Sequence, residues 1–331
     1  MRKRLSVETY FSGIQSGDRT MLGRAISLVE SSRPEDRALA GALVARCHAL
    51  QPDSYRIGIT GVPGVGKSTF IDQFGMYLIE QGHHIAVLAV DPSSPKSGGS
   101  ILGDKTRMAH LSHHPAAFVR PSPSRGTLGG VSQRTRELTL LCEAAGYDII
   151  FIETVGVGQS EVAVKEMVDF FLLLMLPNAG DELQGIKKGV IEMADMMVIN
   201  KADGDHLPAA RTARAQYSQA LRIFPGQHYF WKTPVLLCSA LEGMGFQEIW
   251  EQMGQYQSHA KDSSFWSSNR GKQRLSLMQT HLQQLILESL SRQEAWDEMS
   301  RATSEAVLAG GKDPFSAAQE LFQSWLSAQS K

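Results

Sequence analysis

The sequence has few cysteines: three among 331 residues, with no two in a paired CxxC spacing. This scarcity argues against a disulfide scaffold or a cysteine-rich metal site, and it is typical of reduced, buried thiols in a cytosolic protein. An excess of charge is also missing, because 33 Lys and Arg nearly balance 34 Asp and Glu, for a net charge of -1. Nucleic acid and anionic membranes are therefore not expected as general partners.

Long hydrophobic runs are absent as well. The most apolar stretch, residues 170–176, is far too short to cross a bilayer as a helix, so it predicts a buried strand. The chain starts with basic residues, but Glu8 and further polar residues follow where a signal peptide would need an apolar core. We expect no membrane span and a cytoplasmic location.

The composition that is present, 42% hydrophobic and 20% charged, is ordinary for a globular protein and predicts one sizeable domain with appendages. From residue 55 to about residue 246, short β-branched runs alternate with amphipathic stretches, which predicts an α/β fold with a mostly parallel central sheet flanked by helices. The predicted strands are 56–60, 85–90, 117–120, 149–153, 169–176, 196–200 and 235–239. The predicted helices are 67–81, 133–145, 182–193 and 209–221.

Helical patterns flank this central region on both sides. Apolar residues at helical spacing, interrupted at 31–34, predict an N-terminal helical arm over residues 1–54, followed by a nucleotide-binding domain over 55–254. Two further apolar stripes, at 275–290 and 315–325, predict a C-terminal helical extension over 255–331. This extension could pack against the sheet domain or form an oligomer interface.

A glycine-rich turn between the first predicted strand and the first predicted helix matches the phosphate-binding pattern GxxxxGK[ST]. The residues predicted to hold the nucleotide here are Gly61, Val62, Pro63, Gly64, Val65, Gly66, Lys67, Ser68 and Thr69. Backbone NH groups and the helix N-terminus favour phosphate. We expect Lys67 to contact the β- and γ-phosphates and the Ser68 hydroxyl to bind Mg²⁺. The structural context makes this P-loop prediction strong.

Two later motifs predict that the base is guanine. Asn200, Lys201 and Asp203 form an NKxD motif at the carboxyl end of a predicted strand, where open α/β sheets bind ligands. The Asp203 carboxylate can accept from the guanine ring NH and 2-amino group, a donor pair that adenine lacks. One strand later comes a segment that predicts backbone donors for the guanine carbonyl oxygen: Cys238, Ser239, Ala240 and Leu241.

Acidic strand ends predict the metal site. Glu153 ends a buried strand and Gly156 follows it, as in the DxxG element of GTPases with Glu in place of Asp. We expect Glu153 to hold Mg²⁺ directly or through water and the Gly156 NH to contact the γ-phosphate. Asp91 follows another predicted strand and Asp104 follows a Pro-, Ser- and Gly-rich loop; each could bind the metal or cap a turn.

The group that would orient the attacking water is not evident. The Gln of Ras-like proteins would immediately follow Gly156, but Val157 stands there, so we expect slow intrinsic hydrolysis that a partner or loop completes. The stretch 180–188 could supply such a group, because Lys187 could reach the phosphates; it could equally be a solvated helix start. The histidines at 110, 113 and 114 suit a surface helix end better than a metal store.

Several segments together resemble one family. They are GVPGVGKST at 61–69, DPSSPKSGGSILGD at 91–104, ETVGVGQSE at 153–161, GDELQGIKKG at 180–189 and NKAD at 200–203. The chain closely resembles the methylmalonyl-CoA mutase-associated GTPases of the MeaB/ArgK type, within the metallochaperone-like branch of P-loop GTPases. The resemblance covers most of the chain, including the helical arm and tail.

The resemblance implies a homodimeric GTPase that uses GTP/GDP and Mg²⁺ as a chaperone of an adenosylcobalamin-dependent methylmalonyl-CoA mutase, gating cofactor loading and protecting the mutase. It implies that Asp91 and Asp104 lie in a first switch region, Glu153 in a second, and residues 181–188 in a third that responds to the mutase, with dimer contacts in the tail. Alternatives are a nucleotide-dependent kinase of an arginine/ornithine transport binding protein, a metal-insertion GTPase, and a scaffold without turnover. The guanine motifs argue against ATP as donor, and a Cys/His tract typical of metal carriers is missing from the sequence.

Overall fold

The computed structural model of the chain describes residues 4–31, 33–90, 108–120, 128–154, 160–177, 188–222, 228–291 and 294–329. The chain forms two compact units, residues 1–273 and 274–331. None of the helices in these ranges is long and apolar enough to cross a membrane. The predicted domain boundaries at 54/55 and 254/255 stay predictions; the second falls inside helix α11 (Phe246–Asp262).

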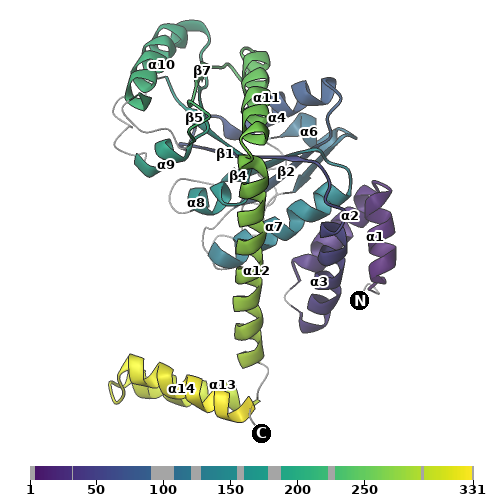
Figure 1. The fold of residues 1–331 in the computed structure, drawn as a ribbon, viewed down its shortest axis with the longest axis vertical. Helices are drawn as coiled ribbons and strands as arrows, with labels where there is room; N and C mark the ends of the chain where they lie inside the picture. The colour runs from purple at the N-terminus through teal and green to yellow at the C-terminus, as the bar shows by residue number, and fades with distance from the viewer. Residues whose placement is uncertain are drawn as a thin grey trace. The chain divides into compact units, whose positions relative to one another are not determined.

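A seven-stranded sheet organises the first unit, and every paired strand in it runs parallel to its neighbour. The strands are β1 (Tyr55–Gly61), β2 (Ile85–Val90), β3 (Ala117–Arg120), β4 (Ile149–Thr154), β5 (Phe170–Met175), β6 (Met196–Ile199) and β7 (Val235–Leu237). Their spatial order is β3-β2-β4-β1-β5-β6-β7, with β1 between β4 and β5. All seven predicted strands and the α/β fold class are confirmed (Figure 1).

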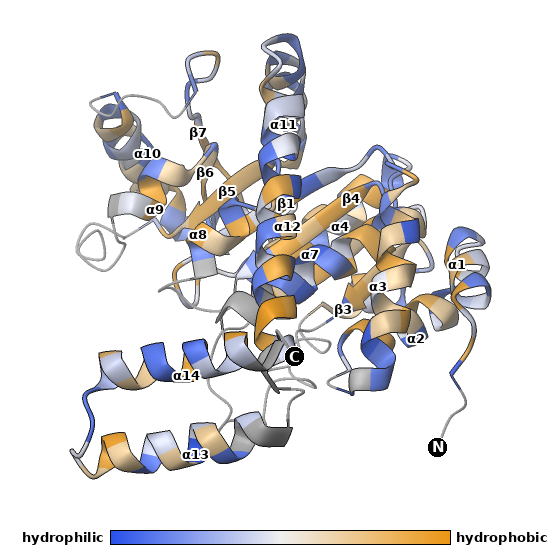
Figure 2. Cartoon of the chain, turned by 60° about the horizontal axis from the view of Figure 1, so that its bottom comes forward, coloured by the Kyte–Doolittle hydropathy of each residue, from blue (hydrophilic) through white to orange (hydrophobic). Residues whose placement is uncertain are grey.

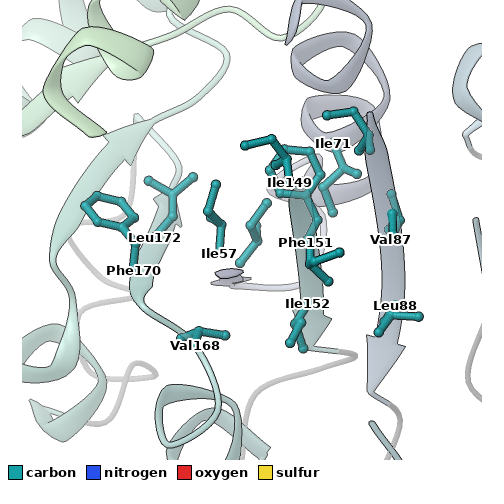
Figure 3. Packing of buried hydrophobic residues seen from close by; sticks show 14 of the residues in the cluster. Ile57, Ile71, Val87, Leu88, Ile149, Phe151, Ile152, Val168, Phe170 and Leu172 are labelled. Atoms are coloured by element: carbon teal, nitrogen blue, oxygen red, sulfur yellow. The ribbon is translucent and has the colours of Figure 1, made fainter. Parts of the chain in front are cut away.

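Both faces of the sheet are covered by helices, and the strands are mostly hydrophobic (Figure 2). Phe151 of β4 and its register partner Ile57 of β1 face α4 (Lys67–Glu80), since the rings of Phe151 and Phe74 lie 6.1 Å apart. The next residue, Gly58, faces the other way, towards α8 (Ser160–Lys165). Figure 3 shows part of this packing around Ile57 and Phe151. A side chain at Gly58 would collide with Val164, so glycine lets α8 approach β1 closely.

The N-terminal region forms three helices that share the core of the sheet. They are α1 (Val7–Gln15), α2 (Arg19–Val29) and α3 (Pro34–His48), which lie beside α7 (Leu128–Ala144) (Figure 1). Ser6 and Asp18 cap α1 and α2 by accepting from backbone NH groups. Tyr10, Ile14 and Ile26 are buried in the same hydrophobic cluster as the strands. Burial of this kind, rather than helix propensity, stabilises such short helices.

The remaining helices of the first unit complete the layers. They are α6 (Ala109–His113), α9 (Lys188–Met193), the short 3₁₀ helix η2 (Gly204–His206), α10 (Leu207–Leu221), α11 and the start of α12 (Phe265–Ser291). Helix α11 packs Phe246 against Phe70 and Phe74 of α4. Predicted helix 133–145 begins earlier, at Leu128. Of predicted helix 182–193, residues 182–187 lie outside the described residues.

Buried ion pairs join α12 to the amino ends of the strands. Arg270 donates to Asp169, before β5, with its Nε 2.6 Å from Oδ1, and to the Ser54 carbonyl oxygen at 2.9 Å. Arg56 of β1 binds Glu143 of α7 through two hydrogen bonds of 2.7 and 2.8 Å. Burial disfavours a charged Glu143, but Arg56 and Arg270 outweigh it and lower the pKa of Glu143. This end of the sheet is therefore fixed by charge pairing.

The second unit consists of the rest of α12 with α13 (Glu294–Leu308) and α14 (Pro314–Gln329). Helices α13 and α14 pack against each other. Asp313 caps α14 by accepting from the NH groups of Phe315 and Ser316 at 3.0 and 2.9 Å. Leu275, Met278, Leu282 and Leu285 recur at intervals of three and four residues along α12 and are exposed in this single chain.

Candidate functional site

The predicted P-loop connects the carboxyl end of β1 to the start of α4, at the centre of the sheet order. Val62 and Val65 are buried and fix the turn from within, while Pro63 and Gly64 are exposed. Ser68 is partly buried in the first turn of α4, and Thr69 beside it is exposed. The loop therefore presents its backbone, rather than bulky side chains, at the helix N-terminus, as phosphate binding requires.

Gly66 occupies a position that other residues would strain. It stands at the N-cap of α4 with φ of 90°, in the left-handed region. A Cβ at this position would also lie 3.0 Å from Nδ2 of Asn200. The second glycine of the motif thus meets two local requirements, backbone conformation and close approach of a neighbouring loop.

The Lys67 ammonium already lies inside the loop. Its Nζ donates to the Gly61 carbonyl oxygen at 2.8 Å and lies 3.5 Å from the Val62 carbonyl oxygen. Burial lowers the pKa of Lys67, and the charges of Glu153 and Glu161 partly offset this by raising it. The cation is therefore held within the loop by backbone carbonyl oxygens, and the charges of two carboxylates act on it.

Asn200 joins the P-loop to the predicted base-binding loops. This residue follows β6 and is 1% exposed. Its Nδ2 donates to the Val65 carbonyl oxygen at 2.8 Å, and its Oδ1 accepts from the Ala240 NH at 3.0 Å. One side chain thus holds three loops that are far apart in sequence.

The other NKxD residues are placed with it. Lys201 has φ of 61°, a conformation rare for a non-glycine residue, and its Nζ donates to the Gly64 carbonyl oxygen at 2.9 Å. The Asp203 carboxylate accepts from the Ser239 hydroxyl. The Ala202 NH donates to the Cys238 carbonyl oxygen at 2.9 Å. The structure therefore brings the two predicted base motifs together, with the Asp203 carboxylate oriented by Ser239.

Cys238 and Leu241 differ in environment. Cys238 is buried, which raises the pKa of its thiol to about 12 and keeps the thiol protonated, so only its backbone is suited to a binding role. Leu241 is 81% exposed directly after Ala240.

Of the predicted metal ligands, Ser68 of the P-loop lies within the described residues, and so does Glu153. This residue is the penultimate residue of β4, is 6% exposed, and pairs in register with Ile59 of β1 and Ala89 of β2. It lies at the same sheet edge as the P-loop. The predicted residues Asp91, Asp104, Gly156 and Lys187 lie outside the described residues, so their roles stay predictions.

Sequence reasoning assigned no role to several residues around this edge. Thr154 donates to the hydroxyl of Thr60 at 2.8 Å, which joins the ends of β4 and β1, and both are fully buried. Glu161, in the first turn of α8, is 2% exposed and contributes to the field at Lys67. Its place within the segment ETVGVGQSE was the available signal.

The histidines of α6 are engaged locally. Nδ1 of His110 lies 2.7 Å from Oδ2 of Asp72, and Nδ1 of His113 donates to the Ala109 carbonyl oxygen at 2.8 Å. Nδ1 of His114 accepts from the Ala116 NH at 3.1 Å. Across the described ranges, no group of three or more His, Cys, Asp and Glu side chains is placed to hold a metal ion.

Comparison with known proteins agrees with this arrangement. The family model described as "Methylmalonyl Co-A mutase-associated GTPase MeaB" matches residues 22–295. A probable GTPase of Mycobacterium tuberculosis is 48% identical over 321 residues, covering 96% of this chain and 95% of that protein. The GTPase ArgK of Escherichia coli is 47% identical over 294 residues, covering 89% of each chain. The mitochondrial methylmalonic aciduria type A homolog of Mus musculus is 46% identical over 331 residues, covering 97% of this chain and 80% of that protein.

A solved structure shares the fold. The crystal structure of a protein described as an LAO/AO transport system kinase superposes with a TM-score of 0.74 and 38% sequence identity, covering 98% of each chain. The match of the family model and these identities establish that the chain belongs to the MeaB family of methylmalonyl-CoA mutase-associated GTPases. It is a P-loop GTPase, as the sequence predicted.

Proposed function

We propose that this chain is a GTP-hydrolysing chaperone of an adenosylcobalamin-dependent methylmalonyl-CoA mutase, gating cofactor loading and protecting the mutase. The observation that carries the nucleotide part is the Asn200 side chain, which holds the P-loop and the Ser239-Ala240 loop in one site. The partner is supported by the description of the family and by the name of the mouse relative. The chain would act as a slow switch that the mutase governs.

The nucleotide roles in this proposal follow the geometry of the loops. The P-loop backbone over residues 61–69 and Lys67 would bind the β- and γ-phosphates of GTP. Asp203 would accept from guanine, and the stem of Lys201 would lie over the base, facing exposed Leu241. The fit to guanine is supported by Ser239, because its bond to Asp203 Oδ2 orients the carboxylate while both of its oxygens keep acceptor sites for the donor pair of the base.

A magnesium ion fits the donors at this edge. The hydroxyl of Ser68 and the carboxylate of buried Glu153 are oxygen ligands of the kind Mg²⁺ prefers, and both belong to elements that meet at the P-loop. Asp91 and Asp104 would complete the set. The ion would neutralise charge on the β- and γ-phosphates.

Hydrolysis would depend on Glu153, the Gly156 NH and a group supplied from the stretch that contains Lys187. Because Val157 replaces the water-orienting Gln of Ras-like proteins, intrinsic turnover would be slow. Binding of the mutase would complete the site.

Dimerisation through the C-terminal helices is part of the proposal. The exposed apolar residues at intervals of three and four along α12 form the pattern of a helix–helix seam. Sedimentation should show a dimer, and the double variant Leu282→Asp/Leu285→Asp should be a monomer. A monomeric parent protein would remove this part of the proposal without affecting GTP binding.

A second candidate is a kinase acting on an arginine/ornithine transport binding protein, favoured by the description of the structural relative. A metal-insertion GTPase is a third. The reaction products distinguish the kinase from either GTPase, because a kinase transfers the γ-phosphate to protein whereas a GTPase releases inorganic phosphate.

The decisive experiment measures phosphate release from GTP and from ATP with Mg²⁺, with and without a cobalamin-dependent methylmalonyl-CoA mutase. GTP should be hydrolysed well above ATP, and the mutase should bind and accelerate it. Lys67→Ala provides the inactive control. Equal rates with ATP would refute the base assignment, whereas absence of both binding and stimulation by the mutase would refute the chaperone role.

A further inference from the structure

A buried hydrogen bond between two threonines joins β1 to β4 beside the predicted phosphate and metal sites. The Thr154 hydroxyl donates to the Thr60 hydroxyl at 2.8 Å, and both residues are 0% exposed. Backbone pairing of these two strands runs to Ile59 and Glu153, so the threonine bond lies one residue beyond that pair. It therefore extends the link between the strands to the carboxyl edge of the sheet, where α/β folds bind ligands.

The threonines and Glu153 face opposite sides of the sheet. Side chains alternate along a strand, and the ring of Phe151 lies against Phe74 of α4, so Glu153, two residues later, faces the side that α4 covers. Thr154 is the next residue and faces the side of α8, as Gly58 of β1 does. The threonine bond thus lies behind Glu153, where it can fix the position of that residue without occupying the site.

Each threonine adjoins, in the chain, a residue of the predicted site. Thr60 precedes Gly61, whose carbonyl oxygen accepts from Nζ of Lys67 at 2.8 Å. Thr154 follows Glu153, the predicted magnesium ligand. One hydrogen bond therefore connects the backbone that holds the Lys67 ammonium to the backbone that carries the Glu153 carboxylate.

The outer neighbours of β1 and β4 are close packed or paired at the same level. A Cβ at Gly61 would lie 2.5 Å from the Leu174 carbonyl oxygen of β5, so β1 already approaches β5 closely there. On the other side of β4, Thr154 is the register partner of Val90 of β2. Because both outer strands are in place, the spacing between the ends of β1 and β4 depends on the bond between the threonines.

We propose that Thr60 and Thr154 are positioning residues for magnesium: their hydrogen bond fixes the Glu153 carboxylate relative to the P-loop and Ser68, with which it would bind Mg²⁺. The inference rests on the proposed role of Glu153 as a magnesium ligand, and not on the mutase or on hydrolysis. Methyl groups in place of the hydroxyls would pack about 3.5–4.0 Å apart, rather than 2.8 Å, and would separate the strand ends. Since Mg²⁺ demands near-ideal geometry, the separation should weaken metal binding more than nucleotide binding.

The test measures GDP affinity in the full chain with saturating Mg²⁺ and in EDTA, and the ratio of the two affinities reports the contribution of the metal. Thr154→Val should lower this ratio on the order of tenfold, while the affinity in EDTA changes by no more than about twofold. Thr154→Ser keeps the hydroxyl and should retain most of the ratio of the parent protein. Thr139→Val is the matched control: it removes a buried threonine hydroxyl that donates to the Thr135 carbonyl oxygen at 2.9 Å within α7, and it should leave the ratio unchanged.

The double variant Thr60→Val/Thr154→Val separates positioning from stability, and it also serves if Thr154→Val does not fold. Thr154→Val alone leaves the Thr60 hydroxyl buried without its donor, whereas the double variant removes both hydroxyls and should unfold at a urea concentration close to that of the parent protein. Its ratio should nevertheless stay low, because two methyl groups cannot approach as closely as two bonded hydroxyls. Recovery of the parent ratio in the double variant would show that the pair acts through stability alone and would overturn the proposal.

Glu153→Gln separates this inference from the role on which it rests. It should lower the ratio as Thr154→Val does, and adding Thr154→Val to it should lower the ratio no further, because the threonine acts through the carboxylate. If Glu153→Gln lowers the ratio but Thr154→Val does not, the inference fails while the role of Glu153 stands. An unchanged ratio in Glu153→Gln would remove Glu153 as a magnesium ligand, and the inference with it, but not the proposed binding of nucleotide by the P-loop.

Discussion

Asn200 donates from Nδ2 to the Val65 carbonyl oxygen at 2.8 Å, so the residue that opens the base motif also supports the phosphate loop. The same side chain accepts from the Ala240 NH. The predicted phosphate loop and the predicted base loops are therefore joined through one buried amide. The three motifs are therefore held together by direct hydrogen bonds of one side chain.

Replacing Asn200 with alanine should weaken both the fold and the site. The Val65 carbonyl oxygen and the Ala240 NH would each lose a partner, at a cost of about 1–3 kcal/mol in the free energy of unfolding. Affinity for GDP should fall about tenfold or more, because the loops are no longer held together. Urea unfolding and GDP titration measure the two effects. Asn269→Ala removes a bond to Val168 at the other sheet edge and should leave GDP affinity unchanged.

Replacing Gly66 with alanine should lower nucleotide affinity by about tenfold. Alanine at φ of 90° is strained by about 1 kcal/mol or more, and its Cβ would approach Nδ2 of Asn200 to 3.0 Å. Gly254→Ala is the matched control, since a Cβ there meets nothing within 4 Å inside α11. It should stabilise the protein by up to about 1 kcal/mol. Equal nucleotide affinity in both variants would contradict the assigned role of Gly66.

Asp203→Asn should change the preferred base. The carboxylate that is predicted to accept two hydrogens from guanine becomes an amide, which can donate to the second carbonyl of xanthine. GDP affinity should therefore fall on the order of a hundredfold, and XDP affinity should rise. Asp205→Asn, at an exposed acid nearby, is the control. Unaltered discrimination between the two bases in Asp203→Asn would show that Asp203 does not read the base.

Nucleotide affinity should fall at alkaline pH because of Lys67. Burial lowers the pKa of Lys67 below the ordinary value of a lysine, and only the protonated ammonium brings a positive charge to the phosphates. The affinity for nucleotide is therefore highest below the lowered pKa of Lys67. It falls as the pH rises through that pKa, by up to about tenfold per pH unit for the loss of one proton. GDP titrations at rising pH should show this loss beginning below the pH at which an ordinary lysine loses its proton.

Glu161→Gln tests the electrostatic part of that prediction. The Glu161 charge raises the pKa of Lys67, so its removal should move the alkaline loss of affinity to lower pH. Glu248→Gln, at an exposed acid of α11, should leave the curve in place. Ionisation of the guanine ring is common to all variants and cancels in the comparison. A shift to higher pH in Glu161→Gln would contradict the arrangement.

The sequence by itself determined the strands and the binding motifs. Runs such as those of β2 and β5 are apolar throughout because parallel strands are buried on both faces, and this pattern is visible without a structure. The P-loop and NKxD motif were predicted at strand ends, and both lie there, because phosphate and base recognition require fixed residue types at fixed spacing.

Only the tertiary structure decided how the helices are held. The composition changes after residue 255, yet α11 continues to Asp262 with Tyr256 and Ala260 buried in the main core. The pairs Lys165–Asp195 and Arg270–Asp169 join residues 30 and 101 positions apart. No local pattern marks such partners, because a charged residue in the sequence looks the same whether it faces solvent or a buried counter-charge. The sequence thus defines what the site can bind, and the fold determines which side chains hold that site in place.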